Sequence, residues 1–255
     1  MTFRLPRPRL QHLPRSPLKL ALIQVRYRPI LAIEQADKVS LFQEALGGSY
    51  EYLDSQRAQS VTVYFGPAGA DPPPPGSAET IWRFRDSETG YLVALSSASL
   101  GFEASQYRDF AHFSAEFSRV LSVLKAIFSP SHRTRLGVRY VNEIEDDRLT
   151  QPSGLPLLIT EHLVRPLGTE LGFDVQSTLS DLRFIQPDGN FVLRHGLVRD
   201  NTYLLDFDYF KEEEVPFDPQ DVRTLATSYH DTVEAVFVWS VTKEYLEELG
   251  TVTHV

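Results

Sequence analysis

Two arginines in a repeated tripeptide carry the clearest chemical pattern in this 255-residue chain. Val25-Arg26-Tyr27 recurs 113 residues later as Val138-Arg139-Tyr140. Two guanidinium groups related by a pseudo-twofold axis could grip one phosphate or carboxylate, because each donates paired hydrogen bonds to such an anion. The alternative is that each arginine makes a structural ion pair with a neighbouring strand, and we favour that interpretation.

Two aspartates form a second pattern. Asp206 and Asp208 alternate with apolar residues on an expected strand, so both carboxylates lie on the same side of it. Such a pair could hold Mg²⁺ or Ca²⁺ through oxygen ligands, but alternation is also what a half-buried strand shows. We favour solvation or pairing with arginines for these aspartates, and we expect no metal.

A small-ligand hypothesis combines these residues. Asn142 lies two positions beyond Tyr140 on the same side of the strand, where it could make an edge hydrogen bond or contact a ligand. His195 and His230 have no serine or aspartate partner at a defined spacing, so we expect both to be structural. The hypothesis places one site between two halves of the chain, formed by Arg26, Arg139, Asn142, Asp206 and Asp208.

The motifs of several enzyme classes are missing from the sequence. It contains neither G-x-x-x-x-G-K-[ST] nor G-x-G-x-x-G, and no G-x-S-x-G, H-E-x-x-H or EF-hand pattern. Without cysteine it has no disulfide, thiolate nucleophile or zinc–thiolate site. We therefore expect no cofactor, and a non-enzymatic protein fits better than an enzyme.

The charge is divided unevenly along the chain. The formal net charge is −9, yet residues 1–28 hold seven basic residues and no acid, which leaves −16 for the rest. Residues 200–255 alone carry −10. Four prolines in residues 1–17 favour an extended, basic arm.

This arm has two interpretations. It could touch nucleic-acid phosphates, although it lacks the interleaved aromatic residues that single-strand binders use, and the acidic remainder would repel nucleic acid. It could instead be a disordered tail, or a tail that docks on the acidic C-terminal end of its own chain or of another copy. We favour a disordered or docking tail.

Periodicity predicts an alternation of strands and helices. Helix 110–128 is the clearest, because Asp109 can cap it and its apolar residues recur every three or four positions. Asp218-Pro219 begins a second long helix that we expect to continue towards residue 249. Shorter helices are predicted at 36–48 and 156–168, a proline-rich loop at 66–79, and strands at 20–29, 57–65, 79–86, 90–97, 100–105, 133–145, 174–186, 190–199 and 203–210.

These elements recur in the same order in both halves. Each half reads as a strand with Val-Arg-Tyr, a short helix, several strands and a long helix, and the long helices begin about 110 residues apart. We therefore expect an α+β fold with helices on one face of antiparallel sheets and an internal duplication of a β-α-β(n)-α unit. The expected divisions are an arm at 1–17 and repeats at 18–131 and 132–255 that share one core.

Four segments are spread along the chain from residue 16 on: Pro17-Leu18 followed by IQVRYRP (23–29), then RLGVRYVNEIE (135–145), YLLDFDYF (203–210) and LATSYHDTVEAVFVWSVT (225–242). Their order and spacing resemble a sporadically distributed family of uncharacterised prokaryotic proteins. The resemblance implies a cytoplasmic protein of similar length with no assigned reaction. Its patchy distribution suggests a two-gene defence or toxin–antitoxin-like system.

The leading functional hypothesis is a regulatory or interaction module that binds another macromolecule. No apolar run approaches the roughly 20 residues that span a bilayer, so we expect a cytoplasmic protein without membrane contact. We expect a protein partner or self-association, with nucleic acid reached only through the basic arm. The alternative is a phosphate-binding or small-ligand enzyme or sensor.

Overall fold

The computed structural model describes residues 13–58, 79–164, 177–199 and 201–250. Its strands are β1 (Leu18–Tyr27), β2 (Tyr50–Ala58), β3 (Glu79–Asp86), β4 (Leu92–Leu95), β5 (Ser99–Ala104), β6 (His132–Glu145), β7 (Ser180–Gln186), β8 (Gly189–Arg199) and β9 (Thr202–Pro216). Its helices are α1 (Ala36–Leu46), α2 (Phe110–Phe128), α3 (Leu155–Leu158), α4 (Glu161–Val164), α5 (Pro219–Ser240) and α6 (Lys243–Leu249), with 3₁₀ turns at Leu31–Glu34, Asp147–Thr150 and Pro152–Gly154.

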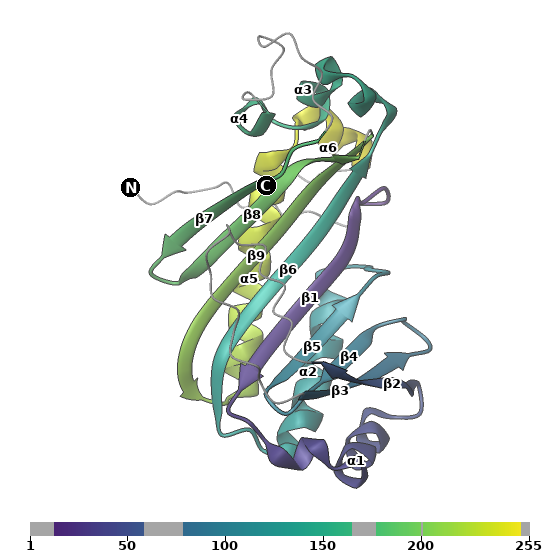
Figure 1. Cartoon of the computed structure of the whole chain (residues 1–255), viewed down its shortest axis with the longest axis vertical. Helices are drawn as coiled ribbons and strands as arrows, with labels where there is room; N and C mark the ends of the chain where they lie inside the picture. The colour runs from purple at the N-terminus through teal and green to yellow at the C-terminus, as the bar shows by residue number, and fades with distance from the viewer. Residues whose placement is uncertain (1–12, 59–78, 165–176, 200, 251–255) are drawn as a thin grey trace.

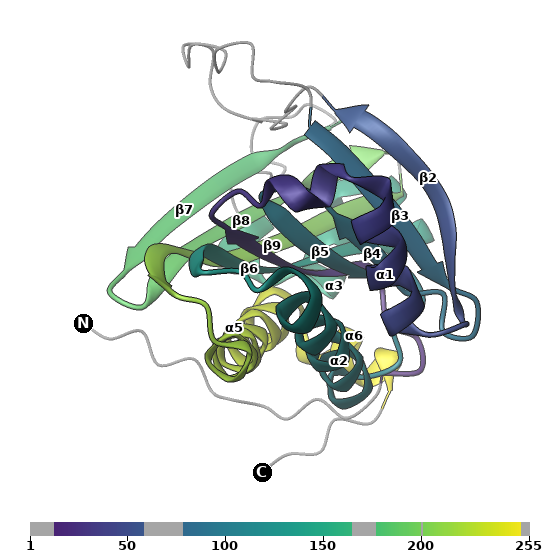
Figure 2. The same cartoon turned by 90° about the horizontal axis from the view of Figure 1, so that it is seen from below.

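Within these residues the strands form one antiparallel sheet of nine, in the order β2-β3-β4-β5-β1-β6-β9-β8-β7. The long helices α2 and α5 lie side by side under one face of this sheet (Figures 1 and 2). The expected α+β class, with helices on one face of an antiparallel sheet, is therefore confirmed. We call the opposite side of the sheet the far face.

Both long helices begin at the predicted aspartate caps. The Asp109 side chain accepts a hydrogen bond from the His112 backbone N–H, and Asp218 does the same for Gln220. The α2 helix ends at Phe128, and its C-cap Ser129 adopts the left-handed conformation with φ of 47°. The apolar stripes of α2 and α5 are buried against the sheet, so burial of one face holds each helix in place.

Strands β1 and β6 pair at the centre of the sheet. Val25 lies opposite Leu136, and Ile23 opposite Val138, with all four side chains buried on the helix-covered face. The alternate residues, including Arg26 and its neighbours in register, therefore point to the far face. Buried residues from both halves of the chain belong to one continuous core.

The strands follow one another outwards from this central pair in matching order. From β1 the neighbours are β5, β4 and β3, and from β6 they are β9, β8 and β7. Strand order alone does not show that the two halves superpose. The internal duplication and the division between residues 131 and 132 remain predictions.

Several predicted boundaries are wrong for reasons that involve distant contacts. Over residues 156–164 the expected helix is two short helices, because Ile159 leaves the helical path to pair with Val241, and residues 165–168 lie outside the described residues. The same bridge ends α5 at Ser240, and Thr242 caps the separate helix α6. Strand β2 begins at Tyr50, earlier than the predicted 57–65, and β7 begins at Ser180. Residues 59–65, the loop up to residue 78, and arm residues 1–12 lie outside the described residues.

Among the described helices, none is both long enough and apolar enough to cross a bilayer.

Candidate functional site

Helix α5 leaves part of the sheet uncovered. It packs on β6 and β9, whereas β7 and β8 extend beyond its flank (Figure 2). A cavity of about 1440 Å³ lies between the helix and these outer strands, and we call it the α5 groove. Its apolar lining residues are Phe184, Phe191, Leu193, Tyr209, Val215, Leu225, Tyr229, Val236 and Trp239.

Aromatic rings follow one another across the α5 groove. Phe191 has its ring centroid 6.1 Å from that of Phe184 and 6.1 Å from that of Tyr209. Tyr209 in turn lies 4.5 Å from Tyr229 on the helix. Phe184 is 46% exposed and Trp239 is half-buried, so the chain leaves aromatic surface uncovered here.

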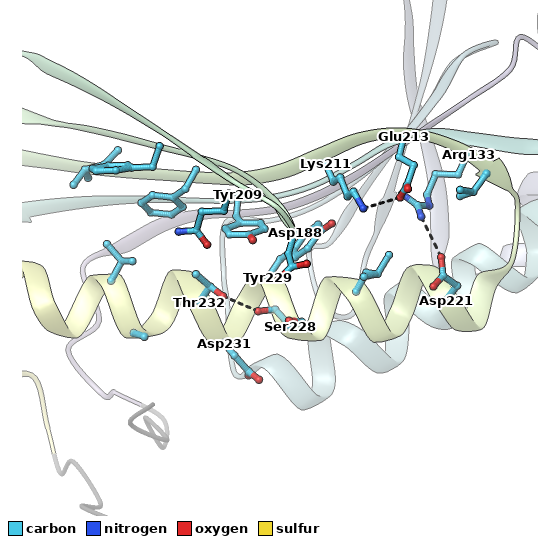
Figure 3. Close-up of a pocket in the computed structure, with 18 of the residues that line it drawn as sticks. Arg133, Asp188, Tyr209, Lys211, Glu213, Asp221, Ser228, Tyr229, Asp231 and Thr232 are labelled. Carbon is cyan, nitrogen blue, oxygen red and sulfur yellow. Dashed lines mark hydrogen bonds and ion pairs between the residues drawn. The ribbon is translucent and has the colours of Figure 1, made fainter. Parts of the chain in front are cut away.

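Arg133 closes one end of the α5 groove (Figure 3). Its side chain is only 2% exposed, and Nη2 donates to Asp221 Oδ2 at 3.1 Å. Nε and Nη1 are buried without a hydrogen-bond partner. A buried donor without a partner costs about 1–3 kcal/mol, and more when the group is charged, so this cation is incompletely satisfied by the described residues.

Tyr229 presents a second unused polar group. Its hydroxyl is buried without a hydrogen-bond partner. Burial is the main cause that raises the pKa of Tyr229 to about 12, so the phenol is neutral at pH 7 and can donate. Lys211 and Glu213 pair with each other at 3.0 Å near the same end (Figure 3).

The rim of the α5 groove is acidic. Among its lining residues, five are acids and two are bases. Each of the two bases pairs with one of these acids, and acids outnumber bases by three across the lining. The charged lining residues are Arg133, Asp188, Lys211, Glu213, Asp218, Asp221 and Asp231.

The far face carries most of the residues predicted from the sequence. Arg139 donates from Nε and Nη2 to the two carboxylate oxygens of Asp206, both at 2.8 Å. Asp206 is 3% exposed and also accepts from Arg194 at 3.1 Å. Arg194 continues the row to Asp181 at 3.3 Å. Hydrogen bonding to Asp206 raises the pKa of Arg139 above its ordinary value.

Asp208 pairs with a residue that the sequence pattern did not single out. Arg135 lies 3.6 Å from Asp208 and 3.2 Å from the Gln24 amide oxygen, with its guanidinium over the Phe210 ring. It also lies against Gly137, where a Cβ atom would come within 2.8 Å of Nη1. Burial raises the pKa of Asp208 and lowers that of Arg135.

Arg26 and Asn142 lie apart from the Arg139–Asp206 pair. Arg26 is exposed and opposite Arg135 in register, whereas Arg139 is opposite Leu22. Four residues along the strands separate the two arginines, roughly 13 Å. Asn142 faces the helices and donates to the Leu205 carbonyl at 3.3 Å. The structure thus gathers Arg139, Asp206 and Asp208 on one face, and their role in ligand binding remains a prediction.

The two histidines make hydrogen bonds to tyrosines. His195 Nδ1 lies 2.7 Å from the Tyr203 hydroxyl, and His230 Nδ1 lies 2.8 Å from that of Tyr140. His230 also stacks on Phe110 beside a small cavity of about 110 Å³, which Asn142 lines as well. Burial lowers the pKa of His230 to about 4, so its ring is neutral at pH 7.

The comparison with known proteins and the search for metal ligands add two findings. A scan against protein-family models and a search of curated proteins found no match. Within the described ranges, no three histidine, aspartate or glutamate side chains are placed to share a metal ion.

The residues of the α5 groove had weak sequence signals. Leu182, Phe184 and Ile185 are apolar on both sides of one strand, which is unusual where one side faces water. Arg133 is the second residue of β6, and its sequence neighbours give no sign that it is buried. Tyr229 belongs to the buried apolar stripe of α5, and such a stripe is typical of a core helix.

Proposed function

We propose that this protein is a non-enzymatic binding module that holds a basic, apolar peptide segment of another macromolecule in the α5 groove. The observation that carries the proposal is an aromatic-lined groove of about 1440 Å³ with an acidic rim. Small-molecule sites are typically about 300–1,000 Å³, so this groove suits a chain segment better than a metabolite.

The neighbouring strand favours an extended segment. Strand β7 ends the sheet within the described residues and pairs only with β8 there. Its free edge can accept another strand through backbone hydrogen bonds. Phe184 points into the α5 groove from this strand, so a segment paired with β7 would place alternate apolar side chains against the aromatic lining.

Charge adds selectivity. The acidic rim favours arginine and lysine between the apolar anchors. None of Arg26, Arg139, Asp206 and Asp208 lines this groove or the small cavity near His230, so the geometry gives less support to a small-ligand site between the repeats.

Fluorescence anisotropy with labelled peptides tests this proposal. A 12-residue peptide that alternates leucine or phenylalanine with arginine should bind at least about tenfold more tightly than the same peptide with glutamate for arginine. The advantage should shrink as salt rises, because the rim charges are exposed. Equal affinity for both peptides, or no binding of either, would overturn the proposal.

Matched variants locate the binding. Asp188→Lys, on the β7–β8 turn at the α5 groove, should weaken the basic peptide several-fold. Asp147→Lys changes an exposed acid outside the groove and should leave the affinity unchanged. Equal loss in both variants would mean that net charge, and not this groove, attracts the peptide.

A further inference from the structure

We propose that the N-terminal arm, residues 1–12, occupies the α5 groove of its own chain and competes there with the partner segment. This inference rests on the function proposed above, since it names an occupant for the same groove. The arm sequence MTFRLPRPRLQH places arginines at positions 4, 7 and 9 among Phe3, Leu5 and Leu10, with no acid. It is therefore a basic, apolar segment of the kind that the groove accepts.

Charge complementarity supports this occupant. The lining of the α5 groove has three more acids than bases, and the arm has three arginines. Two prolines favour an extended arm, which reduces the conformational entropy that binding costs. Apolar side chains between the arginines match the aromatic lining.

The place where the described chain begins brings the arm within reach. Leu13 lies against one flank of α5, in the small cavity that His230, Glu234 and Phe237 line. The next residues are held in place, because the Arg15 backbone N–H donates to the Leu249 carbonyl and Pro14 packs against Gly250. The arm therefore departs from a fixed point beside the helix.

The distance from this point to the α5 groove is short compared with the arm. On α5, the groove residues Ser228, Thr232 and Trp239 lie on the flank opposite His230. An α-helix with its side chains is about 10–12 Å across, whereas 12 extended residues reach about 40 Å. Five or six residues can cross the exposed side of the helix, and the remaining residues can enter the groove.

An arm bound in the α5 groove makes partner binding a competition. A short tether holds the arm at a local concentration of about 1 mM or more, so an external segment must displace it. The apparent affinity for the partner is the intrinsic affinity multiplied by the fraction of molecules whose groove is free. The arm thus sets a threshold for partner binding.

Cysteine cross-linking tests the inference directly, because the natural chain has no cysteine. The full-length double variant Thr2→Cys/Ser228→Cys pairs the arm with an exposed residue of the α5 groove. The matched control Thr2→Cys/Ser40→Cys uses an exposed serine on α1. Under mild oxidation, an intramolecular disulfide should form at least about tenfold faster in the first pair than in the second.

Reversal of the arm charges gives an independent readout. Adding Arg4→Glu, Arg7→Glu and Arg9→Glu should remove the rate advantage and raise the affinity for the basic test peptide about tenfold.

Equal rates in the two cysteine pairs would overturn the inference, and disulfide-linked dimers would assign the arm to the groove of a second copy instead. If the peptide binds but the arm does not cross-link, only this inference fails; if no peptide binds, the proposed function fails.

Discussion

The two faces of the sheet carry arginines from the same strands, but these arginines are paired differently. On the far face, Arg139 and Asp206 satisfy each other through two hydrogen bonds of 2.8 Å, and Arg194 adds a third bond to the same carboxylate. In the α5 groove, Arg133 is buried deeper, yet two of its nitrogens have no partner. Arg194 Nε on the far face is also buried without a hydrogen-bond partner, so the difference between the faces is the doubly bonded Arg139–Asp206 pair, which Arg133 lacks. A carboxylate shared by two arginines stabilises the fold, whereas a buried cation with two unpaired donors costs stability.

Loss of the far-face carboxylate should have the largest effect on stability. Asp206→Ala leaves Arg139 and Arg194 without their shared partner in a half-buried setting. We expect the free energy of unfolding to fall by about 3 kcal/mol. Urea denaturation measures it.

An exposed ion pair serves as the control for Asp206→Ala. Glu143→Ala removes a contact to Arg199, whose side chain is 65% exposed, and should cost no more than about 0.5 kcal/mol. If Asp206→Ala costs as little as Glu143→Ala, the far-face network does not stabilise the fold and the comparison between the faces fails.

The buried side chain of His230 makes the stability of the fold depend on pH. Burial holds the His230 pKa at about 4, below the ordinary value of 6.5. The ring stays neutral in the folded chain while the unfolded chain takes up a proton. Stability from this group is therefore complete above pH 6.5 and is lost as the pH falls towards 4. The expected loss is about 3 kcal/mol.

Denaturation across pH 4–8 checks this linkage against a variant. In His230→Gln the fall in unfolding free energy between pH 6.5 and 4 should be smaller than in the natural chain by about 2–3 kcal/mol. Identical slopes in the two proteins would show that other groups cause the acid loss.

Substitutions at two adjacent residues of β7 distinguish an effect on peptide binding from an effect on folding stability. Phe184 points into the α5 groove, whereas Ile185 is 90% exposed on the other side of the strand. Phe184→Ala should weaken the basic peptide about tenfold, because an aromatic anchor is lost, and should change stability by less than about 1 kcal/mol. Ile185→Ala should leave the anisotropy titration unchanged, and an equal loss of affinity in both variants would place the peptide elsewhere.

Local sequence signals explain the elements but not their spatial relations. The caps Asp109 and Asp218 and the apolar stripes sufficed to predict α2 and α5, since both features are local. The break at Ile159 depends on a bridge to Val241, which lies far away in sequence. No periodicity reports such a contact.

The candidate site was harder to predict for the same reason. Arg139 pairs with Asp206 diagonally across β6 and β9, because the register places Arg139 opposite Asp208 and Asp206 opposite Val141. The α5 groove exists because the helix packs on β6 and β9 and leaves β7 and β8 uncovered, which is a matter of helix placement. Apolar residues on both sides of β7 were the one visible hint.

Amide hydrogen exchange of β7 tests the central claim most directly. In the free chain, amides on the outer edge of Ser180–Gln186 should exchange quickly, because that edge is unpaired within the described residues. Saturation with the basic, apolar peptide should slow their exchange and that of the facing side of α5. Protection confined to the far face or to β2 at the other edge, with β7 unchanged, would contradict the account.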